Sequence, residues 1–277
     1  MIVDVHTHCL QPDHISDAGH RADRRAGYPP LQPLTFARYA EELSVVDRAI
    51  VFGIRGLATG VRSPNEFTAK WVRRDPDKLI GFMAIDPMED DHMEQIERGL
   101  ELGLRGIKIY PMLGRYDPSD PTNFAMFEKA QRLGLPVLSH TGTHPNPRAM
   151  LKYSHPLLVD EIAQAFPDLK YIMAHLSHPW QRDCAIVLRK HPNVYADISG
   201  VWVRPWQGWE ALIGMLEWSV TDKLLFGSDF PLWTPREALA KIRRFNDQLE
   251  GTRLPRIPDE VIDGIVHRDS LKLLGLD

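Results

Sequence analysis

The chain of 277 residues lacks several features that would direct it to particular partners or compartments. Its only two cysteines, Cys9 and Cys184, lie far apart in the sequence, so a reduced, cytoplasmic setting is expected. The net charge of -4 and the pI of about 6.3 give no attraction to nucleic acid or to anionic membranes. No apolar run approaches the roughly 18 residues of a membrane span, and no signal-peptide pattern opens the chain. We therefore expect neither a nucleic-acid partner nor a membrane partner.

The length and the order of the sequence patterns favour one α/β barrel, a fold of about 250 residues. Helical patterns at 36–43, 93–102, 124–133, 157–166 and 209–218 alternate with β-rich runs, and the tail 258–277 predicts one or two closing helices. The eight β-rich runs are 2–5, 48–53, 79–85, 106–110, 136–140, 170–175, 193–198 and 224–228. Such alternation predicts parallel pairing, and eight repeats close naturally into a (β/α)8 barrel. An open doubly wound sheet is the alternative, but no G-x-G-x-x-G follows the first run.

The prediction is therefore a single (β/α)8 TIM-barrel domain over 1–277. The polar, proline-rich segment 11–33 follows the first strand, and this position places it on the catalytic face as a candidate lid.

His6 and His8 form an H-x-H motif at the end of the first predicted strand. Side chains alternate faces along a strand, so both imidazoles point the same way, about 7 Å apart. Imidazole is a good ligand for zinc and related metals, although an isolated H-x-H is more often two surface histidines.

Three further polar side chains end other predicted strands. His140 ends the fifth strand, His175 the sixth, and Asp229 follows the eighth. Because the active site of a barrel lies at the C-terminal strand ends, these residues are expected to meet. His6, His8, His140 and Asp229 together predict a metal site of three nitrogens and one oxygen, with room for water.

The chain resembles the amidohydrolase superfamily, and most closely its amidohydrolase-related branch, which includes aminocarboxymuconate-semialdehyde decarboxylase and small barrel hydrolases. The matching motifs occur in the expected order across nearly the whole chain: VDVHTH, GIKIYP, PVLSHTG, YIMAHLSHPW, NVYADISG and LLFGSDFP. The resemblance implies one divalent metal ion, for which we expect zinc, with manganese as the alternative. It also implies a homodimer by analogy, but it names no substrate.

Lys108 is expected to face the barrel interior, because Ile107 and Ile109 alternate with it. A buried ammonium requires a partner, which could be a carboxylate such as Asp4 or a substrate anion. The other interpretation is a carboxylated lysine that bridges two metal ions, which would recruit His140 and His175 to the second ion. The branch is usually mononuclear, so the bridge is the less favoured interpretation.

The predicted substrate-binding residues are Lys108, Tyr110, Arg55, Trp180, Trp202 and Arg204. His175 is expected beside the substrate, where it stabilises an oxyanion, although packing at a strand end is the alternative. Tryptophans concentrate after the sixth, seventh and eighth strands, and aromatic walls with one cation suit an aromatic or carboxylated substrate. For Trp209 packing beneath a helix is favoured, and for Trp180 and Trp202 the two roles are balanced. Asp197 is expected to support the site.

The leading functional hypothesis is metal-assisted hydrolysis of an ester, lactone, amide or acyl bond, with Asp229 as the base. Non-oxidative decarboxylation of an aromatic or conjugated acid is the alternative. Branch decarboxylases often carry Glu-x-His on the first strand, so the H-x-H motif favours hydrolysis. A TatD-like phosphoesterase is less favoured, because Gly-Ser-Asp229 replaces the Glu-Thr-Asp of that group. A non-enzymatic scaffold would require a damaged site, whereas every strand-end group is present.

Overall fold

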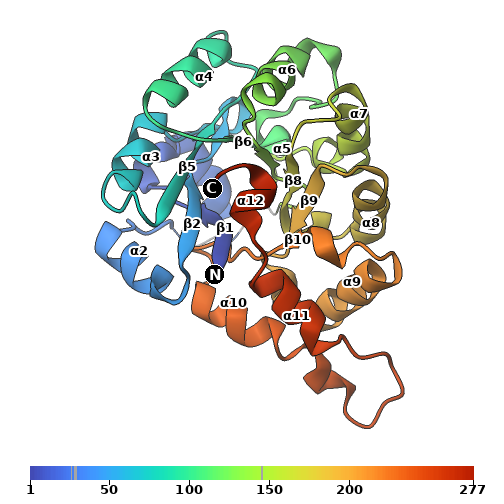
Figure 1. Ribbon diagram of the computed structural model, residues 1–277. Helices are drawn as coiled ribbons and strands as arrows, with labels where there is room; N and C mark the ends of the chain where they lie inside the picture. The colour runs from blue at the N-terminus through green and yellow to red at the C-terminus, as the bar shows by residue number, and fades with distance from the viewer. Residues whose placement is uncertain (26, 28–29, 145) are drawn as a thin grey trace.

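The computed structural model describes residues 1–25, 27, 30–144 and 146–277, and it contains the predicted barrel. Eight parallel strands follow one another in chain order around the sheet, and helices surround them (Figure 1). The strands are β1 (Val3–His8), β2 (Arg48–Phe52), β5 (Leu79–Ala84), β6 (Ile107–Ile109), β7 (Val137–Ser139), β8 (Tyr171–Met173), β9 (Val194–Asp197) and β10 (Leu224–Leu225). The predicted fold class is thus confirmed.

Backbone hydrogen bonds between β1 and the segment after β10 close the sheet into a barrel. Val5 donates to the Phe226 carbonyl (2.9 Å), and Asp229 donates to the His6 carbonyl (2.8 Å). Further along, His8 donates to the Phe230 carbonyl (2.7 Å). The closure therefore places Asp229 directly beside the H-x-H motif, although more than 220 residues separate them in the sequence.

Twelve helices accompany the strands in the described part of the chain. They are α1 (Asp17–Arg25), α2 (Phe36–Glu42), α3 (Asn65–Val72), α4 (His92–Glu101), α5 (Pro111–Gly114), α6 (Phe124–Leu133), α7 (Leu157–Ala165), α8 (Gln181–Lys190), α9 (Pro205–Glu217), α10 (Pro235–Ile242), α11 (Asp259–Val266) and α12 (Ser270–Leu274). All five helical patterns and the helical tail are found, while α1, α3, α5, α8 and α10 were not among the predicted helices. Among the described residues, no helix is both long and apolar enough to cross a membrane.

Two apolar layers form the core. Strand residues such as Val51, Ile107 and Ile109 pack outward against the helices. The opposite faces of the strands fill the barrel with residues such as Val5 and Phe82. Leucines from α12 and the residues after it pack into this inner layer, so the C-terminal segment plugs one end of the barrel (Figure 1). The functional side chains consequently occupy the other end.

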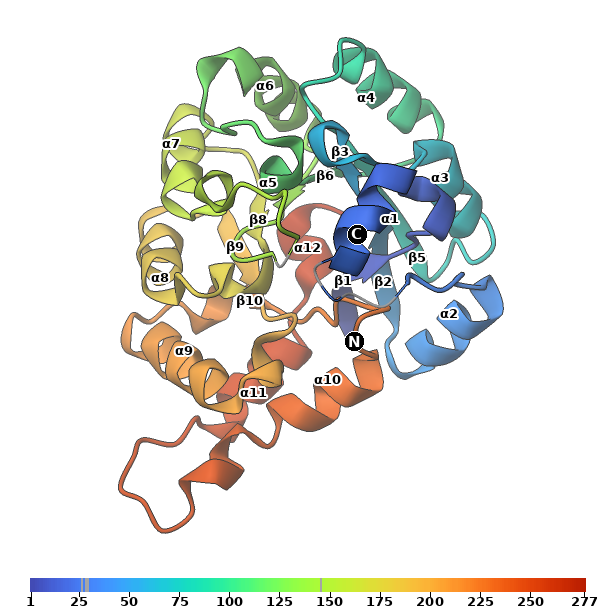
Figure 2. The ribbon, with the colours of Figure 1, turned by 180° about the vertical axis from the view of Figure 1, so that it is seen from behind.

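The segment after β1 lies over this open end, where Figure 2 shows α1 in front of the barrel. Ile15 forms an antiparallel bridge to Val61, which belongs to a small hairpin of β3 (Arg55–Gly56) and β4 (Val61–Arg62) that was not predicted. Residues 26, 28 and 29 of the predicted lid 11–33 lie outside the described residues. The position of α1 is the one that a lid requires, and its role as a lid stays a prediction.

Candidate metal centre and active site

His6 is fixed by a carboxylate two strands away. Its Nδ1–H donates to Asp197 Oδ2 (2.8 Å), and both side chains are fully buried. Gly227 lies between them: a Cβ at this glycine would stand 2.9 Å from His6 Cβ and 3.5 Å from Asp197 Cβ. The missing side chain thus lets Asp197 reach His6. With its proton on Nδ1, the ring turns an unprotonated Nε2 towards the open end of the barrel. Asp197 thus holds the His6 ring in orientation, and its supporting role in the reaction stays a prediction.

Asp229 faces the two histidines of β1. Its Oδ1 lies 3.0 Å from His8 Nε2 and 3.4 Å from His6 Nε2. Its backbone has a φ of 62°, a left-handed conformation that Asp tolerates better than most residues. Burial raises the pKa of the carboxyl, but the hydrogen bond from His8 and the electrostatic influence of the neighbouring histidines outweigh it and hold the pKa below its usual range. Asp229 is therefore an anion in a nearly enclosed place.

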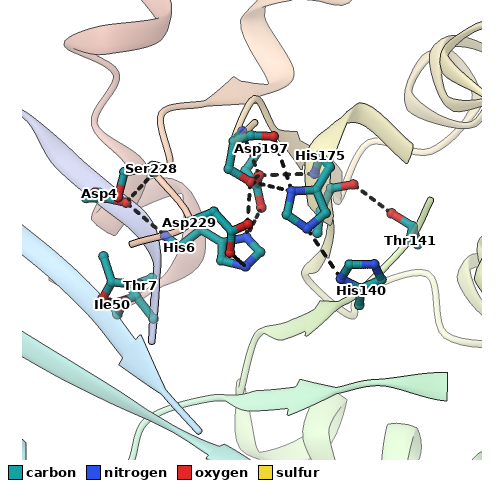
Figure 3. Close-up of polar contacts among 12 residues, drawn as sticks. Asp4, His6, Thr7, Ile50, His140, Thr141, His175, Asp197, Ser228 and Asp229 are labelled. Atoms are coloured by element: carbon teal, nitrogen blue, oxygen red, sulfur yellow. Dashed lines mark hydrogen bonds and ion pairs between the residues drawn. The ribbon is translucent and has the colours of Figure 1, made fainter. Parts of the chain in front are cut away.

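His175 lies between His6 and His140, with ring centroids 4.8 Å from each (Figure 3). It also has a left-handed backbone (φ 58°), held by its N–H bond to Asp197 Oδ1 (3.1 Å). Its Nδ1 faces Ser199 Oγ (2.7 Å) and the Ser199 carbonyl (3.2 Å). A carbonyl only accepts, so Nδ1 carries the proton and Nε2 does not.

The unprotonated Nε2 of His175 faces an unprotonated nitrogen of His140. His140 Nε2–H donates to the Thr143 carbonyl (3.2 Å), which leaves His140 Nδ1 unprotonated, 3.3 Å from His175 Nε2. Burial lowers the pKa of both rings, so neither gains a proton readily at neutral pH. Two lone pairs at this distance repel unless a cation lies near them. Asp229 Oδ1 and His6 Nε2 form a second such pair of acceptors, 3.4 Å apart.

This donor set fits a metal ion. Ligand atoms of His6, His175 and Asp229 all lie within 4.8 Å of one another. His6 Nε2 is enclosed without a hydrogen-bond partner in the described structure. A ligating histidine typically gives its other N–H to a carboxylate, as His6 does to Asp197. Neutral imidazoles and one carboxylate are the forms that bind a divalent cation.

The four predicted ligands do not form one group in this geometry. His6 and Asp229 belong to the convergent cluster, while His8 contacts it through Asp229 and has an enclosed, unpartnered Nδ1. His140 adjoins the cluster through His175 (Figure 3). The predicted ligand set stays a prediction, and the geometry offers His175 as an alternative to His140 as the third histidine ligand.

Lys108 faces the barrel interior as predicted, but the suggested pairing with Asp4 is wrong. Asp4 accepts instead from the backbone N–H groups of His6 (3.1 Å) and Ser228 (2.9 Å), which ties β1 to the end of β10. Lys108 Nζ has no hydrogen-bond partner among the described residues and lies over the rings of Phe52 (4.8 Å) and Tyr110 (5.2 Å). Burial lowers the pKa of Lys108 to about 7 and raises that of Asp4 to about 7.

The other predicted substrate-binding residues occupy different environments. Tyr110 stacks on His140, with ring centroids 4.2 Å apart, and therefore borders the cluster. Arg55 is already paired with buried Glu89 (2.9 Å). Trp202 is buried against Trp233, with its indole nitrogen enclosed and unpartnered in the described structure.

Two more of these residues lie apart from the cluster. Arg204 is exposed and lines a small hollow with His178 and Gln181. Trp180 packs against His155. Trp209, for which packing was favoured, is buried, and its indole nitrogen donates to the Pro255 carbonyl (3.0 Å). Among the described residues, neither Arg204 nor Trp180 forms a hydrogen bond, ion pair or ring contact with the convergent groups.

His144 was missed by the sequence reasoning. Its ring lies 5.7 Å from those of His140 and Tyr110, at the mouth of the site. Its Nδ1 accepts from the Asn146 N–H (3.1 Å), and burial lowers the pKa of His144 to about 4. The only sequence signal was a second histidine four residues after His140, in a loop whose path the sequence does not specify.

The amidohydrolase family model matches residues 3–276, which is nearly the whole chain. The protein belongs to the amidohydrolase family. The 2-amino-3-carboxymuconate-6-semialdehyde decarboxylase of Dictyostelium discoideum is 23% identical over 311 aligned residues, covering 99% of this chain and 79% of its own.

Solved structures with the same fold include both hydrolases and decarboxylases. A probable 2-pyrone-4,6-dicarboxylic acid hydrolase from Acinetobacter baumannii, with citric acid bound, has a TM-score of 0.71 at 14% identity and 99% coverage of both chains. A 5-carboxyvanillate decarboxylase from Novosphingobium aromaticivorans, with bound manganese, has a TM-score of 0.69 at 14% identity, covering 100% of this chain and 97% of its own. The fold is shared by enzymes of either reaction class.

Proposed function

We propose that this amidohydrolase is a metal-dependent hydrolase that cleaves an ester, lactone, amide or acyl bond of a small aromatic or carboxylated substrate. The observation that supports a metal is that two pairs of acceptor atoms lie close together with no donor between the members of either pair: His6 Nε2 with Asp229 Oδ1, and His140 Nδ1 with His175 Nε2. His6 and Asp229 are common to the predicted ligand set and to the described cluster, so we assign both to the ion. The pair His140 and His175 supplies a further nitrogen, and the member that does not bind the ion faces the substrate.

A divalent ion in such a site polarises an acyl oxygen and lowers the pKa of a water molecule. We expect zinc, with manganese as the alternative that the manganese-containing neighbour favours. The chain contributes the proton-handling groups. Asp229, held as an anion, takes a proton from the attacking water. The histidine of the pair that does not bind the ion turns an unprotonated nitrogen towards the substrate side, where it accepts a hydrogen bond from the attacking water or the substrate; the oxyanion role expected of His175 requires that nitrogen to gain a proton first. Asp197 keeps the His6 ring in orientation, and Ser199 keeps the His175 ring in orientation.

The ligand assignment is tested by measuring bound metal in His140→Ala and His175→Ala after dialysis against buffered zinc or manganese. We expect the variant that lacks the metal-binding histidine to lose metal affinity. The other variant should retain the ion but lose turnover. Parental metal affinity in both variants, or no metal bound by the parent protein, would contradict the proposal.

Decarboxylation is the second candidate, because the Dictyostelium decarboxylase matches 99% of this chain. Hydrolysis places a solvent oxygen in the product, whereas decarboxylation releases carbon dioxide and adds a solvent proton to carbon. A screen of aromatic acids and lactones, followed by turnover of any hit in ¹⁸O water, separates the two. Label in a new carboxylate supports the hydrolase. Carbon dioxide release with unlabelled product, and deuterium on carbon in heavy water, would instead assign a carboxy-lyase.

A further inference from the structure

Arg148 carries a partly buried guanidinium that forms no ion pair among the described residues. It lies in the loop after β7, of which residues 141–144 and 146–150 are described, and its Nε and Nη2 are enclosed without a hydrogen-bond partner among the described residues. A Cβ built at Gly19 of α1 would be 3.4 Å from Arg148 Nη2, so the guanidinium lies against the helix over the open end of the barrel. Removing a charged group from water without a partner is costly, so this position is one that an anion would stabilise.

The surrounding contacts fix the backbone of Arg148 but leave its charge unpaired. Asn146 Oδ1 accepts from the Arg148 N–H (2.9 Å), and Arg115 Nε donates to the Arg148 carbonyl (2.9 Å). Asp23 of α1 is the acidic group bound to this loop, and its Oδ1 accepts from Asn146 Nδ2 (3.1 Å). In the described structure no carboxylate forms an ion pair with Arg148, although α1 and the loop are joined beside it.

The same loop carries a hydrogen-bond donor nearer the convergent histidines. His144 Nδ1 accepts from the Asn146 N–H (3.1 Å), so the proton of the neutral ring is on Nε2. This Nε2 has no partner among the described residues, and the ring adjoins His140 and Tyr110. Asn146 therefore links the two groups, since it fixes both the tautomer of His144 and the backbone of Arg148.

We propose that Arg148 forms a carboxylate subsite beside α1, with His144 Nε2–H as a second donor between this subsite and the catalytic groups. The proposal rests on the proposed function and narrows its substrate class to molecules with a carboxylate on the side of the reacting bond that faces α1. A guanidinium binds a carboxylate through two parallel, charge-assisted hydrogen bonds, which gives orientation as well as affinity.

Binding of isophthalate by isothermal titration calorimetry tests the subsite. The protein is treated with a chelator first, so that the carboxylates cannot bind a metal ion. We expect saturable binding to the parent, at least about tenfold weaker binding to Arg148→Gln, and an intermediate loss in Arg148→Lys, which keeps the charge but not the planar fork. Arg98→Gln, an exposed arginine of α4, is the matched control and should bind as the parent does.

Dimethyl isophthalate, which has the same ring without charge, should bind no more tightly to the parent than to Arg148→Gln. Equal isophthalate affinity in the parent, Arg148→Gln and Arg148→Lys would overturn the subsite, as would the absence of isophthalate binding to the parent. Circular dichroism and thermal unfolding confirm that each variant is folded. Because the measurement needs neither metal nor turnover, a failed hydrolase assignment would leave this result intact, and a failed subsite would leave the metal measurements intact.

Discussion

Replacing Lys108 by Met tests how the barrel interior tolerates a basic group. Lys108 is 1% exposed and lies between aromatic rings, with no hydrogen bond to Nζ in the described structure. Methionine has a similar length and no charge, so the substitution removes the cost of burying the ammonium while filling much of the same space. We expect Lys108→Met to be more stable than the parent at neutral pH, in the absence of metal and substrate.

The size of the effect follows from proton binding in the two states. The amine binds a proton below pH 10.5 in the unfolded chain, but only below about pH 7 in the folded protein. Between these values unfolding takes up a proton, so the free energy of unfolding of the parent rises with pH across this window. A lowering from 10.5 to about 7 corresponds to at most about 5 kcal/mol. The advantage of Lys108→Met is therefore largest below pH 7 and shrinks as the pH rises towards 10.5.

Urea unfolding of both proteins between pH 6 and 10, with a chelator present, measures this difference. Titration of Asp4 and of the two cysteines affects parent and variant alike, so it cancels in the comparison. Lys70→Met, at an exposed position on α3, is the control and should show no such trend. A stability difference that does not change with pH would refute the reasoning. If Lys108→Met instead halves the bound metal from two ions to one, Lys108 is a carboxylated bridge.

Four further predictions concern the metal and its supports. Asp229→Asn tolerates the left-handed backbone but loses the base, so kcat should fall about 10²- to 10⁴-fold, and a loss within tenfold removes Asp229 from the mechanism. Asp197→Asn should weaken metal binding about 10- to 100-fold in a competition assay with a metal indicator, and parental affinity would contradict its supporting role. Gly227→Ala should also weaken metal binding, because its Cβ would press on His6, whereas Gly214→Ala, with open space around it, should not. Chelation should abolish turnover, and the ion that restores it, zinc or manganese, identifies the metal; persistent activity without metal would exclude a metal-dependent reaction.

The sequence alone was sufficient to predict the barrel fold and the strand that carries the H-x-H motif. Runs such as residues 48–53 are apolar on both faces, as strands between helices and a barrel interior must be, and their alternation with helices determined the fold class. The H-x-H spacing placed two imidazoles on one face for a purely local reason, the period of two along a strand. Some helices were missed despite a local signal: α10 begins with a capping box of Thr234 and Glu237 that the hydrophobic pattern did not reveal.

The tertiary structure decided which polar groups meet. His6 and Asp197 are 191 residues apart and make contact because the barrel brings β1, β9 and the small Gly227 together. Lys108 faces inward and lies over aromatic rings, whereas the Asp4 carboxylate accepts hydrogen bonds from backbone groups of His6 and Ser228. His144 and Arg148 depend on the path of a loop and on its contact with α1. Strand periodicity is a property of neighbouring residues, whereas these contacts depend on register, closure and loop path, which no short segment of the chain encodes.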